Sequence, residues 1–206
     1  MKKNLPKNLL KILSSILIVA TLVFFVPKTA EAATLGNTNI GASSAATANV
    51  ICSKFTTTEA ATVTSMTMYA NQDTGNTVAG AIYTDNGSSY PNAKIAEDTG
   101  NTTGTGVAAW LTVNISASLS ASTAYWFCTW ASDSRTVYWD AGSTNQYVTQ
   151  GMTFETWANP FTAGGTQFAR ALSVYVNYTP TTLTTPAPSV VLSDGQMIIN
   201  GQVIIK

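Results

Sequence analysis

The chain of 206 residues contains no histidine. Histidine is the commonest general base and metal ligand, so Ser–His–Asp triads and nearly all zinc sites are excluded. No phosphate-binding glycine loop, dinucleotide fingerprint or Gly-x-Ser-x-Gly elbow occurs either. A pair of carboxylates could still hydrolyse a glycoside, and the candidates are Glu59, Glu97, Glu155 and Asp140. We expect Glu59 and Glu97 to be solvated, because both lie at predicted strand ends, so the sequence favours a protein without catalytic activity.

Aromatic side chains are the next group that could bind a ligand, and many of them fall in one stretch. Between residues 125 and 157 they are Tyr125, Trp126, Phe127, Trp130, Tyr138, Trp139, Tyr147, Phe154 and Trp157. Rings in the core of a fold bury a large apolar area, and we favour that interpretation for Trp126 and for Trp110. Rings beside a loop are better placed to meet a ligand, because binding residues concentrate on loops.

The predicted ligand site lies beside a long loop over residues 140–166. Trp139 and Trp157 border this loop, and Tyr147 lies within it. Sugars stack on exposed ring faces, and Asn145 and Gln146 could add hydrogen bonds to their hydroxyl groups. Core packing is an equal alternative for the two tryptophans, so their exposure decides between the interpretations.

Two further pairs of residues are candidates for a cross-link or a metal. Cys52 and Cys128 are the only cysteines, and they form either a disulfide or two buried thiols. Asp73 and Asp98 each begin a copy of Asp-Thr-Gly-Asn, whose oxygen atoms suit calcium. Two turns explain this repeat more simply, so we expect no cofactor, with calcium as the alternative.

The elements that must position these residues are β-strands. After residue 32 the chain shows no helical periodicity; short runs rich in Thr, Val and aromatic residues are separated by Asp, Asn and Gly. The predicted strands cover residues 47–56, 61–70, 78–84, 93–97, 109–115, 124–131, 136–140 and 166–178. About eight strands at this spacing predict an all-β fold, an antiparallel, jelly-roll-like β-sandwich.

Alternation in the last predicted strand separates an apolar face from a polar one. The apolar face holds Phe168, Leu172, Val174, Val176 and Tyr178, and the polar face holds Gln167, Ser173 and Asn177. Arg170 falls on the apolar face. We expect it to reach solvent at the rim, because an unpaired buried charge is costly; pairing with Asp140 or Glu155 is the alternative.

The first 32 residues have the three parts of a secretory signal peptide. Four lysines (Lys2, Lys3, Lys7 and Lys11) precede an apolar run over 12–26, and Ala30-Glu31-Ala32 supplies a cleavage site. The run of 15 residues is shorter than the roughly 20 that cross a bilayer. We therefore expect cleavage after Ala32 and an extracellular or cell-surface protein, with an uncleaved anchor as the alternative.

Charge narrows the range of partners. Residues 33–206 carry five basic and nine acidic side chains, a net charge of about −4. Nucleic acids and anionic lipids attract clustered lysine and arginine, so neither nucleic acid nor, after signal cleavage, membrane is an expected partner.

Composition divides the rest of the chain into three parts. We predict a sandwich domain over 33–178, an extended Pro/Thr linker over 179–188, and a β-meander over 189–206. Asp194-Gly195 and Asn200-Gly201 are hairpin signals, and Gly-Gln-x-Ile-Ile occurs twice in the meander. A segment of 18 residues buries little by itself, so we expect it to pair with another chain; docking on its own sandwich is the alternative.

Three blocks of sequence resemble a known module. They are residues 54–69, residues 78–96 with Val78-Ala-Gly-Ala-Ile-Tyr and Pro91, and residues 109–126 with Ala109-Trp-Leu-Thr-Val, Leu119 and Tyr125-Trp126. Over residues 45–178 the chain resembles a recurrent β-sandwich module of bacterial and phage surface proteins, similar to carbohydrate-binding modules. The resemblance implies a jelly-roll-like architecture. Modules of this kind accompany adhesins, tail fibres or secreted polysaccharide-acting enzymes. It carries over no binding residue.

These features together favour a secreted or surface-attached, non-catalytic binding module with glycans as its ligand class. The alternative is a structural protein whose residues 189–206 assemble chains or attach them to a larger body. A secreted polysaccharide-acting enzyme is the third interpretation.

Overall fold

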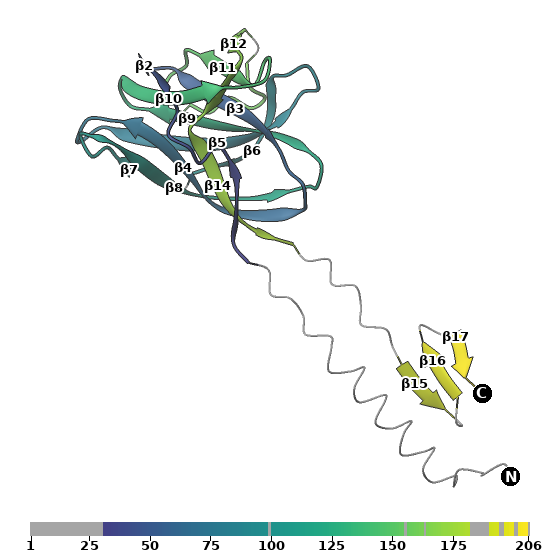
Figure 1. Cartoon of the computed structure of the whole chain (residues 1–206). Helices are drawn as coiled ribbons and strands as arrows, with labels where there is room; N and C mark the ends of the chain where they lie inside the picture. Colours follow the sequence, from purple (N-terminus) through teal and green to yellow (C-terminus); the bar gives the residue numbers. More distant parts are fainter. Residues whose placement is uncertain are drawn as a thin grey trace, which may run out of the picture. The chain divides into compact units, whose positions relative to one another are not determined.

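The computed structural model describes residues 31–98, 100–154, 156–162 and 164–181, together with three short strands between residues 190 and 205. The described chain is all-β, and two large antiparallel sheets pack face to face as a β-sandwich, as the sequence predicts (Figure 1). No helix in these ranges is long and apolar enough to cross a bilayer. Residues 1–30 of the predicted leader and 182–188 of the predicted linker lie outside the described residues.

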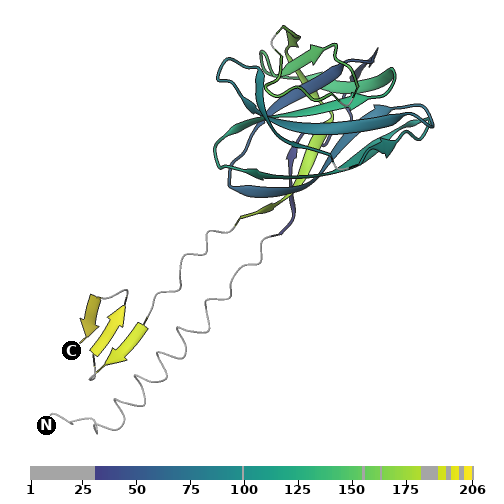
Figure 2. The same cartoon turned by 180° about the vertical axis from the view of Figure 1, so that it is seen from behind.

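The first sheet, called sheet A, carries both ends of the sandwich. Its strands are β1 (Ala33–Gly36), β2 (Ser43–Thr47), β4 (Ala61–Asn71), β8 (Ala108–Leu119), β10 (Arg135–Ala141), β13 (Arg170–Leu172) and β14 (Val174–Pro180). The order is β1-β14-β4-β10-β13, with β8 paired to β4 and β2 to β10. Because β1 and β14 are antiparallel neighbours, the chain enters and leaves the sandwich at the same end (Figure 2).

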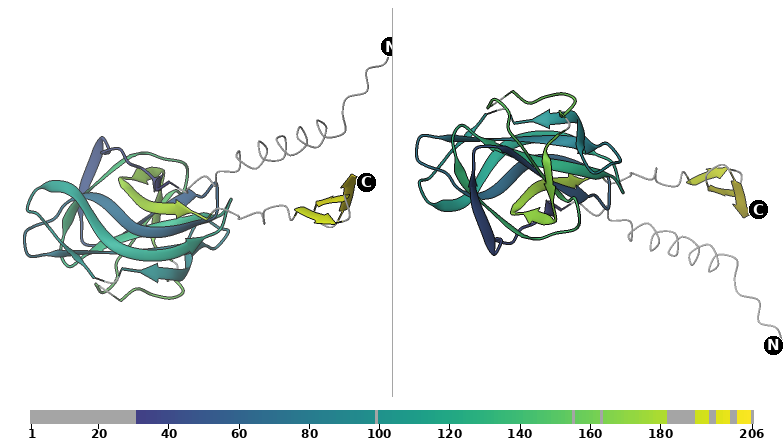
Figure 3. Two further views of the ribbon diagram at one scale, coloured as in Figure 1. Left: turned by 90° about the horizontal axis from the view of Figure 1, so that it is seen from below. Right: turned by 90° about the horizontal axis from the view of Figure 1, so that it is seen from above.

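The second sheet, called sheet B, faces sheet A. Its strands are β3 (Val50–Thr56), β5 (Thr77–Asp85), β6 (Pro91–Glu97), β7 (Thr102–Thr103), β9 (Ala124–Ala131), β11 (Tyr147–Gln150) and β12 (Thr166–Phe168). The order is β12-β11-β3-β9-β5-β6, with β7 paired to β5. The chain crosses between the sheets repeatedly, for example from β3 to β4 and from β8 to β9 (Figure 3).

The strands differ from the predicted ones in two regions. The predicted loop over 140–166 contains β11, and the predicted strand over 166–178 is three strands, of which β12 belongs to sheet B and β13 and β14 to sheet A. The strands β1 and β2 also lie in residues 33–47, where mostly small and polar side chains give little alternation to detect.

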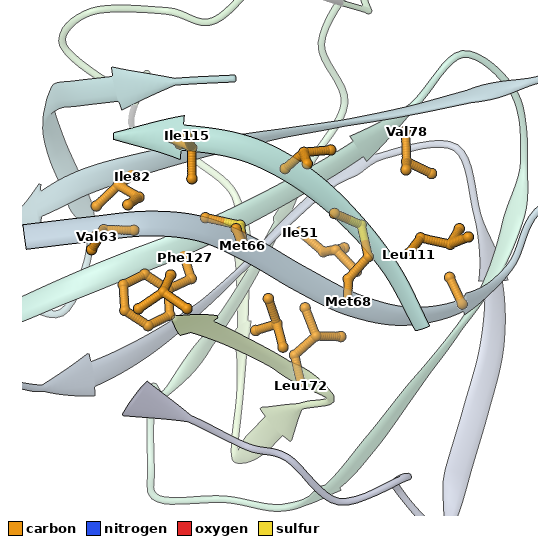
Figure 4. Packing of buried hydrophobic residues seen from close by; sticks show 14 of the residues in the cluster. Ile51, Val63, Met66, Met68, Val78, Ile82, Leu111, Ile115, Phe127 and Leu172 are labelled. Carbon is orange, nitrogen blue, oxygen red and sulfur yellow. The ribbon is translucent and has the colours of Figure 1, made fainter. Parts of the chain in front are cut away.

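The core between the sheets follows strict alternation. In β8 the side chains of Leu111, Val113 and Ile115 are buried, while Thr112 and Asn114 between them are exposed. Figure 4 shows the packing of this core, to which β3, β4, β5, β9, β13 and β14 also contribute. Its labelled residues are Ile51, Val63, Met66, Met68, Val78, Ile82, Leu111, Ile115, Phe127 and Leu172.

A charged side chain, that of Arg135, is also buried on the inner side of the sheets. Arg135 is 2% exposed, and its Nη2 donates to Thr129 Oγ1 at 3.0 Å. Burial lowers the pKa of Arg135 to about 10. Arg135, Val137 and Trp139 occupy every second position of β10, so all three point to the same inner face.

The outer face of sheet B carries a second core, made by a loop that lies on the sheet. Trp126, Trp130 and Tyr83 from the strands pack with Trp157 and Phe161 from the loop over residues 151–165. Several hydrogen bonds hold this loop; among them, Tyr83 Oη donates to Ala158 O (2.9 Å), Phe161 N to Asn92 O (2.8 Å) and Lys94 N to Asn159 Oδ1 (3.0 Å). The rings therefore belong to the fold and have no free faces.

Beneath this loop Cys52 and Cys128 form a disulfide. The two residues are direct partners in the register of β3 and β9, with Cα atoms 3.9 Å apart. Both are buried in the second core. The bridge thus links adjacent strands of the same sheet. The sequence left open a disulfide or two buried thiols, and the structure has the disulfide.

The C-terminal strands form a separate three-stranded antiparallel sheet. They are β15 (Val190–Ser193), β16 (Gln196–Ile199) and β17 (Gln202–Ile205), in that order. The sequence predicts a meander over the same residues, with turns at its two hairpin signals.

Candidate functional site

Trp157 lies in the second core, which is the core-packing alternative to its role as a sugar platform. It is 8% exposed, and its ring centroid lies 5.3 Å from that of Trp130. The loop it belongs to folds onto apolar strands, so the ring is needed to cover sheet B. Trp126 is fully buried in the same core, as predicted.

Tyr147 of sheet B and Trp139 of sheet A lie between the two sheets, around Arg170. Tyr147 is 3% exposed, and Trp139 is half-buried against the core between the sheets. The guanidinium of Arg170 lies 4.3 Å from the ring centroids of both Trp139 and Phe168, and 5.7 Å from that of Tyr147. Cation–π contacts therefore hold this half-buried charge. The sequence predicts that Arg170 reaches solvent at the rim, with a carboxylate partner as the alternative, and neither interpretation includes these rings.

Asn145 and Gln146 build a turn. Asn145 has a φ of 57°, a left-handed conformation that asparagine tolerates better than most residues. Gln146 Oε1 accepts from Ser143 N at 2.8 Å, and its Nε2 donates to Lys54 O at 3.1 Å. Both polar groups of this amide are thus hydrogen-bonded to backbone atoms. The five residues of the predicted site therefore do not form one surface: Trp157 lies in the second core, and the other four pack in the fold or hold a turn.

The structure brings together a different set of rings on the outer face of sheet A. We call Tyr69, Trp110, Tyr138 and Tyr175 the aromatic strip; all four are half-buried. The centroid distances are 5.2 Å for Tyr69–Trp110, 4.9 Å for Tyr69–Tyr138 and 5.2 Å for Trp110–Tyr175. The four rings form one continuous array across β10, β4, β8 and β14.

The register of the strands explains the array. Tyr69 and Trp110 are direct cross-strand partners, and Tyr175 is the partner of Thr67, one step along the same face. On all these strands the neighbouring residues point into the core, so the rings must point outward. Side chains of this face, among them Thr112 and Asn114, are exposed to solvent.

Hydroxyl and amide groups border the strip along one side. Cross-strand pairing places Thr34, Asn177, Ser65 and Asn114 in one row over β1, β14, β4 and β8, which we call the polar row. Asn177 Nδ2 donates to Ser65 Oγ at 2.8 Å. Between this row and the rings, the hydroxyl groups of Thr67 and Thr112 are 2.9 Å apart. These contacts fix the side chains before any ligand arrives.

The face is also free of formal charge within its four main strands. None of β1, β4, β8 and β14 contains Asp, Glu, Lys or Arg. A surface of aromatic rings with uncharged donors and acceptors suits a neutral ligand with both apolar faces and hydroxyl groups.

Sequence reasoning missed this set, although the signal was present. In β8, Trp110 shares its alternation phase with Thr112 and Asn114, and in β14 Tyr175 shares its phase with Asn177. Ring size alone predicts a core position for Trp110, which is wrong for this half-buried, outward-facing residue. Alternation was the better guide.

The carboxylates considered for catalysis hold structural contacts. These contacts are Asp140 Oδ2 with Asn37 Nδ2 (3.2 Å), Glu97 Oε2 with Lys94 Nζ (2.6 Å) and Glu59 Oε1 with Tyr178 Oη (3.1 Å). Glu155 lies outside the described residues. Glu59 also borders a hollow of about 180 Å³, lined by Leu35 and Tyr178 among others, which is small for a substrate site.

Of the two calcium candidates, Asp73 lies in a turn, whereas Asp98 directly follows β6 and pairs with Gly80 of β5. Asp73 O accepts from Asn76 N at 3.2 Å, and Asp98 Oδ1 accepts from Gly80 N at 3.1 Å. Within the described ranges, no three His, Cys, Asp or Glu residues gather as metal ligands.

Comparison of the sequence with known protein families and with curated proteins finds no match. The resemblance to surface modules therefore stays a prediction.

Proposed function

We propose that this protein is an exported, non-catalytic module that binds neutral glycans on the aromatic strip. The observation that carries the proposal is the continuous array of four half-exposed rings beside a row of hydroxyl and amide groups. Ring faces pack against the C–H faces of a sugar, and amides and hydroxyls pair with its hydroxyl groups.

Charge favours a glycan over a nucleic acid. Aromatic platforms also stack bases, but single-stranded nucleic acid additionally requires a positively charged groove. The strands β1, β4, β8 and β14 carry no basic residue, and Arg135 on β10 is buried on the inner side of the sheets. Asp140, Glu97 and Glu59 hold structural contacts, which supports binding without hydrolysis.

The test is affinity for a panel of soluble neutral polysaccharides, measured by affinity electrophoresis and then calorimetry. We expect Trp110→Ala and Tyr138→Ala to weaken binding at least tenfold. Ile95→Ala is the matched control, because Ile95 is an exposed apolar residue on β6 in sheet B, and it should bind as the wild type does. A wild-type protein that binds no polysaccharide in the panel contradicts the proposal.

Export is supported by the position of the first strand. The predicted cleavage after Ala32 leaves Ala33 as the first residue, and β1 begins at Ala33. Cleavage there keeps the whole of β1, which pairs with β14. N-terminal sequencing of protein from the culture medium should begin at Ala33; a chain that keeps Lys2 contradicts soluble export.

A second candidate function is assembly through the C-terminal strands. Three strands of four residues each form a very small sheet, and their sequence is rich in Ile and Val. An exposed edge of such a sheet is a site for pairing with another chain, and the same segment of a second copy is the partner we propose. Light scattering should find an oligomer for residues 33–206 and a monomer for residues 33–181. Monomers in both cases contradict self-assembly.

A further inference from the structure

The rings of the aromatic strip are steeply tilted against one another. The interplanar angles are 62° for Tyr69–Trp110, 68° for Tyr69–Tyr138 and 62° for Trp110–Tyr175. Each contact is edge-to-face, and the packing of the half-buried rings against one another favours this tilt. Neighbouring rings therefore cannot offer coplanar faces.

This tilt discriminates between two physical forms of a polysaccharide. The surface of a crystalline polysaccharide is flat, and rings must lie in one plane to touch it together. A single hydrated chain can rotate about its glycosidic bonds, so successive sugars can meet ring faces at different angles. Tilted rings match the second form only.

The direction of the strip adds a second argument. Tyr175, Tyr69 and Trp110 lie on the adjacent strands β14, β4 and β8, so the strip runs across the strands. The polar row runs across the same strands, parallel to the strip. A chain that lies along the rings therefore meets hydrogen-bonding groups along one edge over its whole length.

The strip is also open at the β1 side. The residue opposite Tyr175 is Gly36, where a Cβ atom would lie 2.4 Å from Val174 O, so no side chain fits there. A polymer can continue past Tyr175 over this glycine. Recognition of internal chain segments fits this geometry better than recognition of a chain end.

Resting on the glycan-binding function proposed above, we infer that the strip binds one hydrated, neutral polysaccharide chain across β14, β4 and β8 and does not adsorb to crystalline polysaccharide. The polar row holds one edge of that chain. Affinity then grows with oligosaccharide length until the strip is filled.

The experiment compares soluble and crystalline probes on the exported full chain. The soluble probes are β-1,3-glucan, xylan, galactomannan and pullulan in affinity electrophoresis; the insoluble probes are microcrystalline cellulose and crystalline chitin in sedimentation. We expect retardation by at least one soluble polymer and no adsorption to either solid. Trp110→Ala should weaken soluble binding at least tenfold and Asn177→Ala about fivefold, while Ile95→Ala changes neither. Thermal unfolding of each variant shows that the fold is kept.

Three outcomes overturn the inference in different ways. Adsorption to a crystalline probe that Trp110→Ala removes contradicts the inference but leaves glycan binding standing. Absence of binding to every probe contradicts the proposed function itself. Binding of a peptide with the sequence of residues 179–188 that Tyr138→Ala removes would make the strip a groove for proline-rich peptide, against both proposals.

Discussion

The outer faces of the two sheets both carry rows of aromatic rings, yet only one of them is open. On sheet B, Trp126 and Trp130 are covered by the loop over residues 151–165. On sheet A, Trp110 and Tyr69 stay half-exposed. Similar aromatic content therefore has two outcomes, a second core in one case and a candidate binding surface in the other.

The neighbours of the rings account for the difference. On sheet B the rings stand among Val50, Ala79, Ala81 and the disulfide, so an uncovered face would expose a wholly apolar patch to water. On sheet A the rings stand beside Thr67, Thr112 and a row of amides and hydroxyls. Exposing the wholly apolar patch of sheet B to water would be unfavourable, because burial of apolar area stabilises the fold. The mixed surface of sheet A can stay exposed, because its amide and hydroxyl groups form hydrogen bonds with water.

The largest expected effect tests whether the closed face is a true core. Trp130→Ala removes a ring that packs on Phe154 and Trp157, and such truncations cost about 3–5 kcal/mol. We expect a loss of that size in the free energy of unfolding, measured in denaturant. Glycan affinity should not change under conditions where the variant is folded. A loss under about 1 kcal/mol would mean that the loop is only a loose cover.

The disulfide beneath the loop is expected to rank second. It spans 76 positions of sequence, for which the chain-entropy account of a disulfide gives roughly 4 kcal/mol, within the usual range of about 2–5 kcal/mol. Replacing both Cys52 and Cys128 by alanine should lower the free energy of unfolding by that order. Mass spectrometry after alkylation without reductant should find no free thiol in the wild type, and two labelled cysteines would contradict the bridge.

The third prediction contrasts one tryptophan from each face. Trp110→Ala should weaken glycan binding at least tenfold, which is about 1.4 kcal/mol, because central aromatic residues dominate binding surfaces. Its cost in stability should be only about 1 kcal/mol, the value of a cross-strand aromatic pair. Trp157→Ala should have the opposite effects: it should strongly lower the free energy of unfolding and leave glycan affinity unchanged. Equal effects of the two variants on binding would remove the distinction between the faces.

The open face was predictable from sequence, and the closed face was not. In β8, strict alternation places Trp110 with hydroxyl and amide side chains, which is enough to orient it outward. In β9, Tyr125, Trp126, Phe127 and Cys128 follow one another, so both faces are apolar and alternation carries no information. Which of these faces is covered by a loop depends on where residues 151–165 fold, a tertiary fact that local pattern does not contain.

The same limit applies to single residues. Cys52 and Cys128 were visible as a pair, but only the order of β3 and β9 makes them neighbours. Arg170 was correctly placed on an apolar face by its alternation, whereas its ring partners come from β10, β11 and β12. Periodicity predicts the direction of a side chain; the strand order decides what it meets.

The smallest effect concerns the hydrogen bond from Tyr83 Oη to Ala158 O, which holds the loop on the closed face. Tyr83→Phe should cost about 1 kcal/mol at pH 7, the usual net value of one hydrogen bond, and should speed proteolysis within residues 151–165. Burial, assisted by the charge of Glu97, raises the pKa of Tyr83 above its ordinary value of 10.0. In the unfolded chain the phenol ionises near pH 10, whereas the folded protein keeps its proton, so this stabilising term is complete below pH 10 and is lost as the pH rises further. Phenylalanine has no proton to lose.

The difference in unfolding free energy between wild type and Tyr83→Phe should therefore shrink above pH 10, as measured by denaturant unfolding between pH 7 and pH 11. A difference that stays constant over this range would mean that Tyr83 reaches solvent and that the loop does not seal the second core.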